Sequence, residues 1–256
     1  MTHIMEVRSL TKRFGGLVAV DDVDFDIRRS TIFSIIGPNG AGKSTLFDLL
    51  TRVQDADAGQ VVTDAGDLLS LPTHAVVHQG IARTFQHAQL IETASVRDNV
   101  TIGYLRFRPA GLLASLFRQG RYRSGQRLED EQVQRVLQLM NLDAVQDQLV
   151  STSSTLVRQL TSVAMAMASE PTMLLLDEPM GGLVESEVQI LMDSLRTINR
   201  TGVTIVLIEH RMPAVMALSD HVLVLNFGRR IALGTPDEIQ RNPHVIEAYL
   251  GSRHAD

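Results

Sequence analysis

The 256-residue sequence contains no cysteine, which excludes a disulfide framework and thiol chemistry and suits a reducing compartment. It also lacks any run of about 18 apolar residues, so we expect no membrane-spanning helix. The first residues carry neither the basic nor the apolar region of a signal peptide. The net charge of −5 argues against a general nucleic-acid-binding protein, whose surface is normally basic. We therefore expect a cytosolic protein with no nucleic-acid partner.

The sequence is organised around a glycine-rich segment, GPNGAGKST, at residues 37–45. An apolar run at 31–36 precedes it and residues 46–50 continue it, which predicts a buried strand, a tight turn and a helix start. Such a P-loop directs backbone N–H groups and the helix dipole at a polyphosphate. Lys43 can reach the β- and γ-phosphates, and the Ser44 hydroxyl can ligate Mg²⁺. The residues expected to bind a nucleoside triphosphate here are Gly37, Pro38, Asn39, Gly40, Ala41, Gly42, Lys43, Ser44 and Thr45.

Two further apolar runs end in chemically active side chains. The run at 172–176 closes on Asp177 and Glu178, which is the Walker B pattern. Asp177 is expected to help hold Mg²⁺, and Glu178 to act as general base or to orient the water that attacks the γ-phosphate. A surface Asp-Glu pair is the alternative, which the upstream P-loop disfavours. The run at 202–208 ends at Glu209 and His210, where His210 can hydrogen-bond the γ-phosphate.

Other segments leave alternatives open. Phe14, in a turn expected at 12–16, can stack on an adenine base or cap the edge of a sheet. Gln86, at the end of a short strand, is on its own an ordinary loop glutamine. Apolar residues at helical spacing in 128–142 predict a helical sub-domain. The apolar, arginine-rich stretch at 104–121 can pack against a membrane partner or expose solvated arginines.

The chain resembles the ATP-binding subunit of an ABC transporter over almost its whole length. The resemblance lies in the order of its features: the aromatic turn, the P-loop, the glutamine, the Walker B pattern and the histidine. Segments 11–17, 80–86, and 222–235 followed by 245–251, are similar to the branched-chain amino acid importer subfamily. The resemblance implies a single ABC ATP-binding domain with an α/β P-loop NTPase core, an antiparallel β sub-domain and an inserted helical sub-domain. Residues 1–86 and 172–256 would form the core, and about 87–171 the helical part.

The resemblance also implies roles for individual residues. Phe14 would stack on the adenine of ATP, Gln86 would join Ser44 at Mg²⁺ while sensing the membrane subunit, and His210 would be the switch histidine. The expected catalytic residues are therefore Lys43, Gln86, Glu178 and His210. The expected Mg²⁺ ligands are Ser44, Gln86 and Asp177.

Three departures from the family pattern stand out. The signature, usually Leu-Ser-Gly-Gly-Gln, reads SSTLV at residues 153–157 and lacks the glycines that bring backbone N–H groups to the opposite subunit's γ-phosphate. The loop after Walker B, here called the D-loop (residues 180–184), ends in Val184 instead of Asp or Asn. Arg211 replaces the Asp that commonly follows the histidine. The chain is thus equipped to hold ATP but poorly equipped to complete a partner's site, which predicts a heterodimer with a second ABC ATPase.

The expected function is ATP binding and hydrolysis for an importer of branched-chain amino acids or a similar small solute. The subunit would be peripheral on the cytoplasmic face of the plasma (inner) membrane, with permease subunits as partners and a solute-binding protein as an indirect one. Alternatives are a weakly hydrolysing regulatory or structural half of a heterodimeric ATPase, and a lipopolysaccharide-export-type ATPase. A soluble non-transport ABC protein is a further alternative, although the chain has neither a second cassette nor a long coiled-coil insertion.

Overall fold

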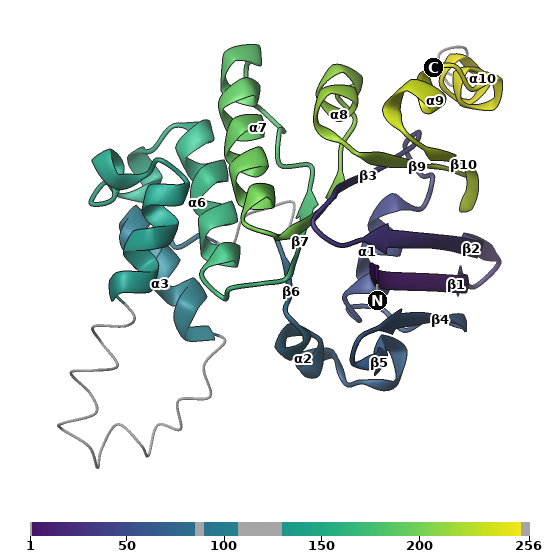
Figure 1. Ribbon diagram of the computed structural model, residues 1–256, viewed down its shortest axis with the longest axis horizontal. Helices are drawn as coiled ribbons and strands as arrows, with labels where there is room; N and C mark the ends of the chain where they lie inside the picture. Colours follow the sequence, from purple (N-terminus) through teal and green to yellow (C-terminus); the bar gives the residue numbers. More distant parts are fainter. Residues whose placement is uncertain (1, 85–89, 107–129, 252–256) are drawn as a thin grey trace.

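The computed structural model describes residues 2–84, 90–106 and 130–251, which form two sheets and the helices around them (Figure 1). A four-stranded antiparallel sheet has the order β2-β1-β4-β5, and a six-stranded sheet has the order β10-β9-β3-β8-β7-β6. In the six-stranded sheet only the pair of β9 and β10 is antiparallel. The strands are β1 (His3–Phe14), β2 (Leu17–Arg28), β3 (Ile32–Ile36), β4 (Ala58–Thr63), β5 (Gly66–Asp67), β6 (Ile81–Arg83), β7 (Met173–Asp177), β8 (Thr204–Ile208), β9 (His221–Asn226) and β10 (Arg229–Gly234).

Helices connect and cover these strands. The α-helices are α1 (Lys43–Leu50), α2 (Thr73–Val76), α3 (Val96–Arg106), α6 (Thr155–Met167), α7 (Glu185–Arg200), α8 (Met212–Leu218), α9 (Pro236–Gln240) and α10 (Pro243–Gly251), and residues 130–139 are also helical. Short 3₁₀ turns are η1 (Leu68–Ser70), η2 (Val77–Gln79), η3 (Asp143–Val145) and η4 (Val150–Thr152). In Figure 1, α3, α6 and α7 lie on one side of the molecule and the antiparallel sheet on the other. Within the described residues no helix is long and apolar enough to cross a membrane.

The central strands β3, β7 and β8 are buried along their whole length, because both faces of the sheet are covered. Alternate side chains serve different cores. Leu174 and Ile205 pack with helices α6 and α7, whereas Leu175 and Val206 pack with α1 and the antiparallel sheet. Helix α7 contributes one apolar stripe at helical spacing, formed by Val188, Leu191, Met192, Leu195 and Ile198. The polar ends of β7 and β8 therefore project from a rigid, dry layer.

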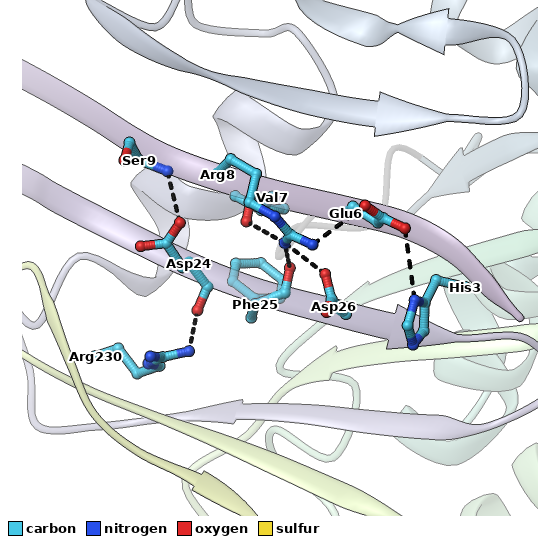
Figure 2. Close-up of polar contacts among 9 residues, drawn as sticks. All are labelled: His3, Glu6, Val7, Arg8, Ser9, Asp24, Phe25, Asp26 and Arg230. Atoms are coloured by element: carbon cyan, nitrogen blue, oxygen red, sulfur yellow. Dashed lines mark hydrogen bonds and ion pairs between the residues drawn. The ribbon is translucent and has the colours of Figure 1, made fainter.

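The β9–β10 hairpin ties the antiparallel sheet to the six-stranded one. Gly228, at its tip, accepts a hydrogen bond from Asp21 N (2.9 Å) and donates one to Ala41 O (3.0 Å). Figure 2 shows Arg230 donating to the carbonyl of Asp24 on β2, beside the ion pair of Arg8 with Asp26 (2.5 Å). The P-loop residue Ala41 is thus held by the same hairpin that contacts β2.

Most expected elements are present, with two differences. Strand β1 continues to Phe14, so the turn expected at 12–16 is reduced to Gly15 and Gly16 because Lys12 and Arg13 still pair with β2. Strand β6 ends at Arg83, and Gln86 lies outside the described residues. The arginine-rich stretch expected at 104–121 lies outside them beyond residue 106.

Candidate nucleotide-binding site

The P-loop leaves the carboxyl end of β3 and runs into α1, as the sequence predicts. Two of its glycines are fixed by close packing. Gly37 (φ 154°) and Gly42 (φ 98°) have backbone conformations that favour glycine, and a Cβ atom on either would lie 2.2 Å from a carbonyl oxygen, of Leu225 or Ala19 respectively. The loop is thus wedged between β2 and β9, which keeps its backbone N–H groups in a defined curve.

Lys43 stands at the first position of α1 and its side chain curls back over the loop. Its Nζ donates to Gly37 O (2.8 Å) and Pro38 O (2.9 Å). Burial lowers the pKa of Lys43, and the nearby carboxylates of Glu178 and Asp177 oppose that shift. Ser44, the next residue, is exposed in the first turn of α1, where its hydroxyl is accessible.

Asp177 and Glu178 follow β7 at the same edge of the sheet. Asp177 is buried, and its Oδ2 accepts from Arg83 Nη2 (3.2 Å). Burial raises the pKa of Asp177, while the charge and hydrogen bond of Arg83 counteract this rise. Glu178 has a left-handed backbone (φ 49°), and its Oε2 lies 4.0 Å from Nδ1 of His210, which follows β8. Because β8 lies between β3 and β7, His210 stands between the P-loop and Walker B.

Phe14 lies at the end of β1 with 45% of its surface exposed. The Nζ of Lys12 sits 5.3 Å above its ring, and Lys12 in turn pairs with Asp57 (3.4 Å). The ring is therefore presented to solvent by a fixed strand end, a geometry open to stacking by a base.

A cavity of 1050 Å³ adjoins the P-loop. Its walls are the loop backbone at 37–41, His210, the hairpin tip at Asn226 and Phe227, and helix α10. On α10, burial raises the pKa of Tyr249 to about 12, while the Gly37 N–H that bonds to its oxygen works in the opposite direction. Helix α10 and the hairpin tip lie far from the P-loop in the sequence, and only the tertiary fold brings them to it.

Arg83 is a further residue that sequence reasoning missed. Its guanidinium bonds to Asp48 on α1 (2.6 Å) and to Asp177, so it links three elements of the site. The available signal was an arginine at the end of an otherwise apolar short strand, Ile81–Arg83. In the described part of the chain no group of three or more His, Cys, Asp or Glu side chains is arranged to hold a metal ion by itself.

The signature segment 153–157 lies at the start of α6. Ser154 is the N-cap, and its Oγ accepts from Val157 N (3.3 Å). Thr155 is exposed, and its Cγ2 lies 3.5 Å from the position of a Cβ on Gly182 in the D-loop. Leu156 and Val157 are half-buried against the helical core. Signature and D-loop thus form one contiguous surface of this chain.

The sequence matches two family models. The one described as "ABC transporter" matches residues 20–181, and the one described as "Branched-chain amino acid ATP-binding cassette transporter" matches residues 229–255. The second match covers β10, α9 and α10, which include the α10 wall of the cavity.

Curated relatives and solved structures are similar over nearly the whole chain. The branched-chain amino acid transport ATP-binding protein BraF of Pseudomonas aeruginosa is 37% identical, with 97% of this chain and 98% of BraF covered. LivG of Escherichia coli, with the same description, is 34% identical at the same coverage. A nucleotide-free ATP-binding cassette from an ABC transporter superposes with a TM-score of 0.84 at 28% identity, covering 96% of this chain and 98% of that one. A cassette in its ADP conformation gives a TM-score of 0.84 at 27% identity, covering 98% and 100%.

Proposed function

Because the chain belongs to the ATP-binding subunits of ABC transporters, we propose that it binds and hydrolyses ATP to power import of branched-chain amino acids or a similar small solute. The observation that carries this proposal is a convergence at one edge of the six-stranded sheet. The P-loop, Asp177, Glu178 and His210 follow β3, β7 and β8, and Glu178 lies 4.0 Å from His210. Ligand sites of open α/β sheets lie at this carboxyl edge.

The residues present fit a nucleoside triphosphate. Gly37 and Gly42 pack so closely against the carbonyls of Leu225 and Ala19 that the backbone of the loop is fixed, and the start of α1 adds its positive dipole. Exposed Phe14 offers a face for adenine. Ser44 and Asp177, together with Gln86 outside the described residues, would hold Mg²⁺, which neutralises phosphate charge when bound.

Each side chain has a task that its position allows. Lys43 exchanges its two carbonyl bonds within the loop for phosphate oxygens, so its amine is already oriented before the ligand arrives. Glu178 orients the attacking water or accepts its proton. His210, with its side chain 59% exposed at the end of β8, donates to the γ-phosphate as negative charge moves during transfer.

The proposed assembly is a heterodimer docked on permease subunits. Thr155 and Leu156 stand where glycines would bring backbone N–H groups to a partner's nucleotide, so a homodimer would have two weakened sites. A partner with a glycine-containing signature would complete the site on this chain's P-loop. The helical part, about residues 87–171, would contact the permease from the cytoplasmic face, and the solute-binding protein would act through the permease.

The same signature favours a second candidate, a subunit that binds ATP but hydrolyses it weakly as the regulatory half of such a dimer. Reconstitution in vesicles with partner ATPase, permease and binding protein tests both. We expect ATP-dependent leucine uptake that Glu178→Gln in this chain abolishes. Uptake that is unaffected by this substitution would support the regulatory role. ATP turnover without uptake of any branched-chain amino acid would overturn the solute assignment.

A further inference from the structure

The D-loop is held from both sides by the two residues that flank His210. At its beginning, the N–H of Met180 donates to Oε1 of Glu209 (2.8 Å). Near its end, Leu183 O accepts from Nη2 of Arg211 (2.5 Å). Two separate strand ends, those of β7 and β8, are thereby joined across the catalytic edge of the sheet.

Glu209 is completely buried, which is unusual for a carboxylate and demands compensating hydrogen bonds. Its two oxygens receive separate donors, Met180 N on one and its neighbour His210 N (3.2 Å) on the other. Burial raises the pKa of Glu209, and backbone hydrogen bonds from Met180, His210 and Arg211 oppose the rise. This side chain is oriented toward backbone, and its contacts lie in the D-loop and in the 209–211 segment.

Arg211, which replaces the Asp that commonly follows the histidine in this family, makes contacts of its own. Its guanidinium donates to the Leu183 carbonyl and lies 3.9 Å from Oε2 of Glu185 at the start of α7. A carboxylate at position 211 has no proton to donate to a carbonyl, so an Asp there would lose the bond to Leu183. Arg211 therefore makes a contact that the family's usual Asp could not make.

Backbone hydrogen bonds connect the D-loop to Glu178. Gly181 N donates to Glu178 O (3.1 Å), Leu183 N donates to Met180 O (3.3 Å), and Glu178 N donates to Ile208 O (3.0 Å). The backbone of Glu178 is in a left-handed conformation (φ 49°) that a non-glycine residue adopts only when its surroundings impose it. A displacement of residues 180–183 would therefore reach Glu178 directly.

We propose that Glu209 and Arg211 are positioning residues that hold Glu178 beside His210 by fixing the D-loop. This inference rests on the proposed function, because Glu178 must be the group that acts on water. The bonds from Glu209 and Arg211 set the beginning and the end of the turn, and the turn sets the direction of the Glu178 side chain. Loss of either bond allows Glu178 to shift relative to His210 while the P-loop is left as it is.

The first test is a double-mutant cycle, in which ATPase kinetics of the assembled enzyme are measured for variants at positions 211 and 178. Arg211→Met keeps an unbranched apolar side chain and removes its donors, whereas Arg211→Lys keeps a charged amine that can donate. We expect Arg211→Met to lower kcat roughly tenfold or more, since small misplacements of a catalytic group have effects of this size, with KM for ATP nearly unchanged. Arg211→Lys should recover most of the loss. In a Glu178→Gln background the same Arg211→Met change should alter the single-turnover rate less than about twofold, because the group it positions is already gone.

A matched control is available in Arg196, whose guanidinium also donates to a backbone carbonyl, Ala217 O (3.0 Å). Its side chain is 32% exposed against 31% for Arg211, and it lies on α7 away from the nucleotide site. Arg196→Met should leave kcat as it is. An equal loss of rate for Arg211→Met with and without Glu178, or an equal loss for Arg196→Met, would overturn the positioning role.

The second test does not depend on activity. Amide hydrogen exchange in nucleotide-free protein should accelerate at Met180 in Glu209→Leu and at Leu183 in Arg211→Met, by about tenfold or more, with P-loop amides unaffected. Unchanged exchange at both amides overturns the inference, whatever the ATPase activity. If exchange accelerates in the variants as expected but the wild-type assembly hydrolyses no ATP, the contacts of Glu209 and Arg211 stand and the proposed function is overturned instead.

Discussion

The Nη2 of Arg83 lies 3.2 Å from Oδ2 of Asp177, in a pair whose side chains are 9% and 6% exposed. The other terminal nitrogen of the same guanidinium bonds to Asp48 on α1 at 2.6 Å. The buried guanidinium of Arg83 therefore balances the negative charges of two carboxylates, Asp177 after β7 and Asp48 on α1. Removal of one partner from a buried ion pair is costly, because the remaining charge stays in a poorly solvated place.

Arg83→Met should consequently lower the free energy of unfolding by about 3–5 kcal/mol at neutral pH. The measurement is urea-induced unfolding of purified protein, followed by circular dichroism. Arg196→Met, at a half-exposed arginine on α7, serves as the control and should cost less than about 1 kcal/mol. If Arg83→Met lowers the free energy of unfolding no more than the control does, water must solvate the Asp177 carboxylate without the arginine.

The same variant should have a steeper dependence of stability on pH. Burial places the pKa of Asp177 in the folded protein above its ordinary 3.8, so the native state holds this proton more tightly than the unfolded chain. Stability attributable to this group is then highest in acid and falls as the pH rises from 3.8 through the raised value. Without Arg83 the pKa rises further, so the fall extends to higher pH. Unfolding curves from about pH 4 to 8 test this, and Asp177→Asn added to Arg83→Met should remove the extra slope.

Lys43→Ala should weaken ATP binding about 10- to 100-fold. Hydrogen bonds to charged groups contribute roughly 1.5–3 kcal/mol, and each 1.4 kcal/mol is a factor of ten. Titration calorimetry with ATP and Mg²⁺ measures the dissociation constant, and the circular dichroism spectrum verifies that the fold is intact. An unchanged constant would remove the P-loop from the binding site.

Glu178→Gln should slow ATP hydrolysis on the order of 10²-fold or more, because it keeps the shape of the side chain and removes the charge that acts on water. ATP binding should persist, so the variant is expected to retain ATP in a complex with its partner ATPase. Phosphate release under single-turnover conditions is the measurement. Turnover at the wild-type rate would place the base elsewhere or show that this chain's site is silent.

Restoring the signature should raise activity. The triple change Thr155→Gly, Leu156→Gly and Val157→Gln returns backbone access at the start of α6, and loss of one such donor costs roughly 10²-fold in rate at comparable sites. The gain should be greatest at the partner's P-loop, which this signature faces in the proposed heterodimer. The wild-type chain alone should be nearly inactive. A fully active homodimer whose rate the triple change does not alter would refute the asymmetric arrangement.

Local patterns in the sequence were sufficient to predict the framework of the site. The P-loop and the apolar runs before Asp177 and Glu209 each carry their own glycine or apolar pattern, so the predicted and observed elements agree closely. The turn expected at residues 12–16 was predicted too long, because Lys12 and Arg13 still pair with β2.

Long-range contacts could not be predicted in the same way. Arg83 bonds to Asp48 and Asp177, and Arg211 bonds to a carbonyl on a different loop. Nothing in the residues beside each arginine indicates these partners. Glu209 was read as the neighbour of a histidine, since only burial and the Met180 N–H reveal its purpose. The stacking of Phe14 on adenine and the contact of His210 with the γ-phosphate stay predictions.

The order of strands in the six-stranded sheet has a consequence for biosynthesis. Strand β3, which leads into the P-loop, pairs with β8 and β9 but never with β7, so both of its neighbours lie far downstream in the chain. A ribosome must therefore have made the chain beyond Asn226 before β3 has both partners, even though the P-loop emerges early. Until then, the strand that leads into the P-loop lacks the neighbours that fix it in the sheet. High contact order of this kind slows folding and prolongs the exposure of apolar strands, which makes the unfinished chain a substrate for chaperones.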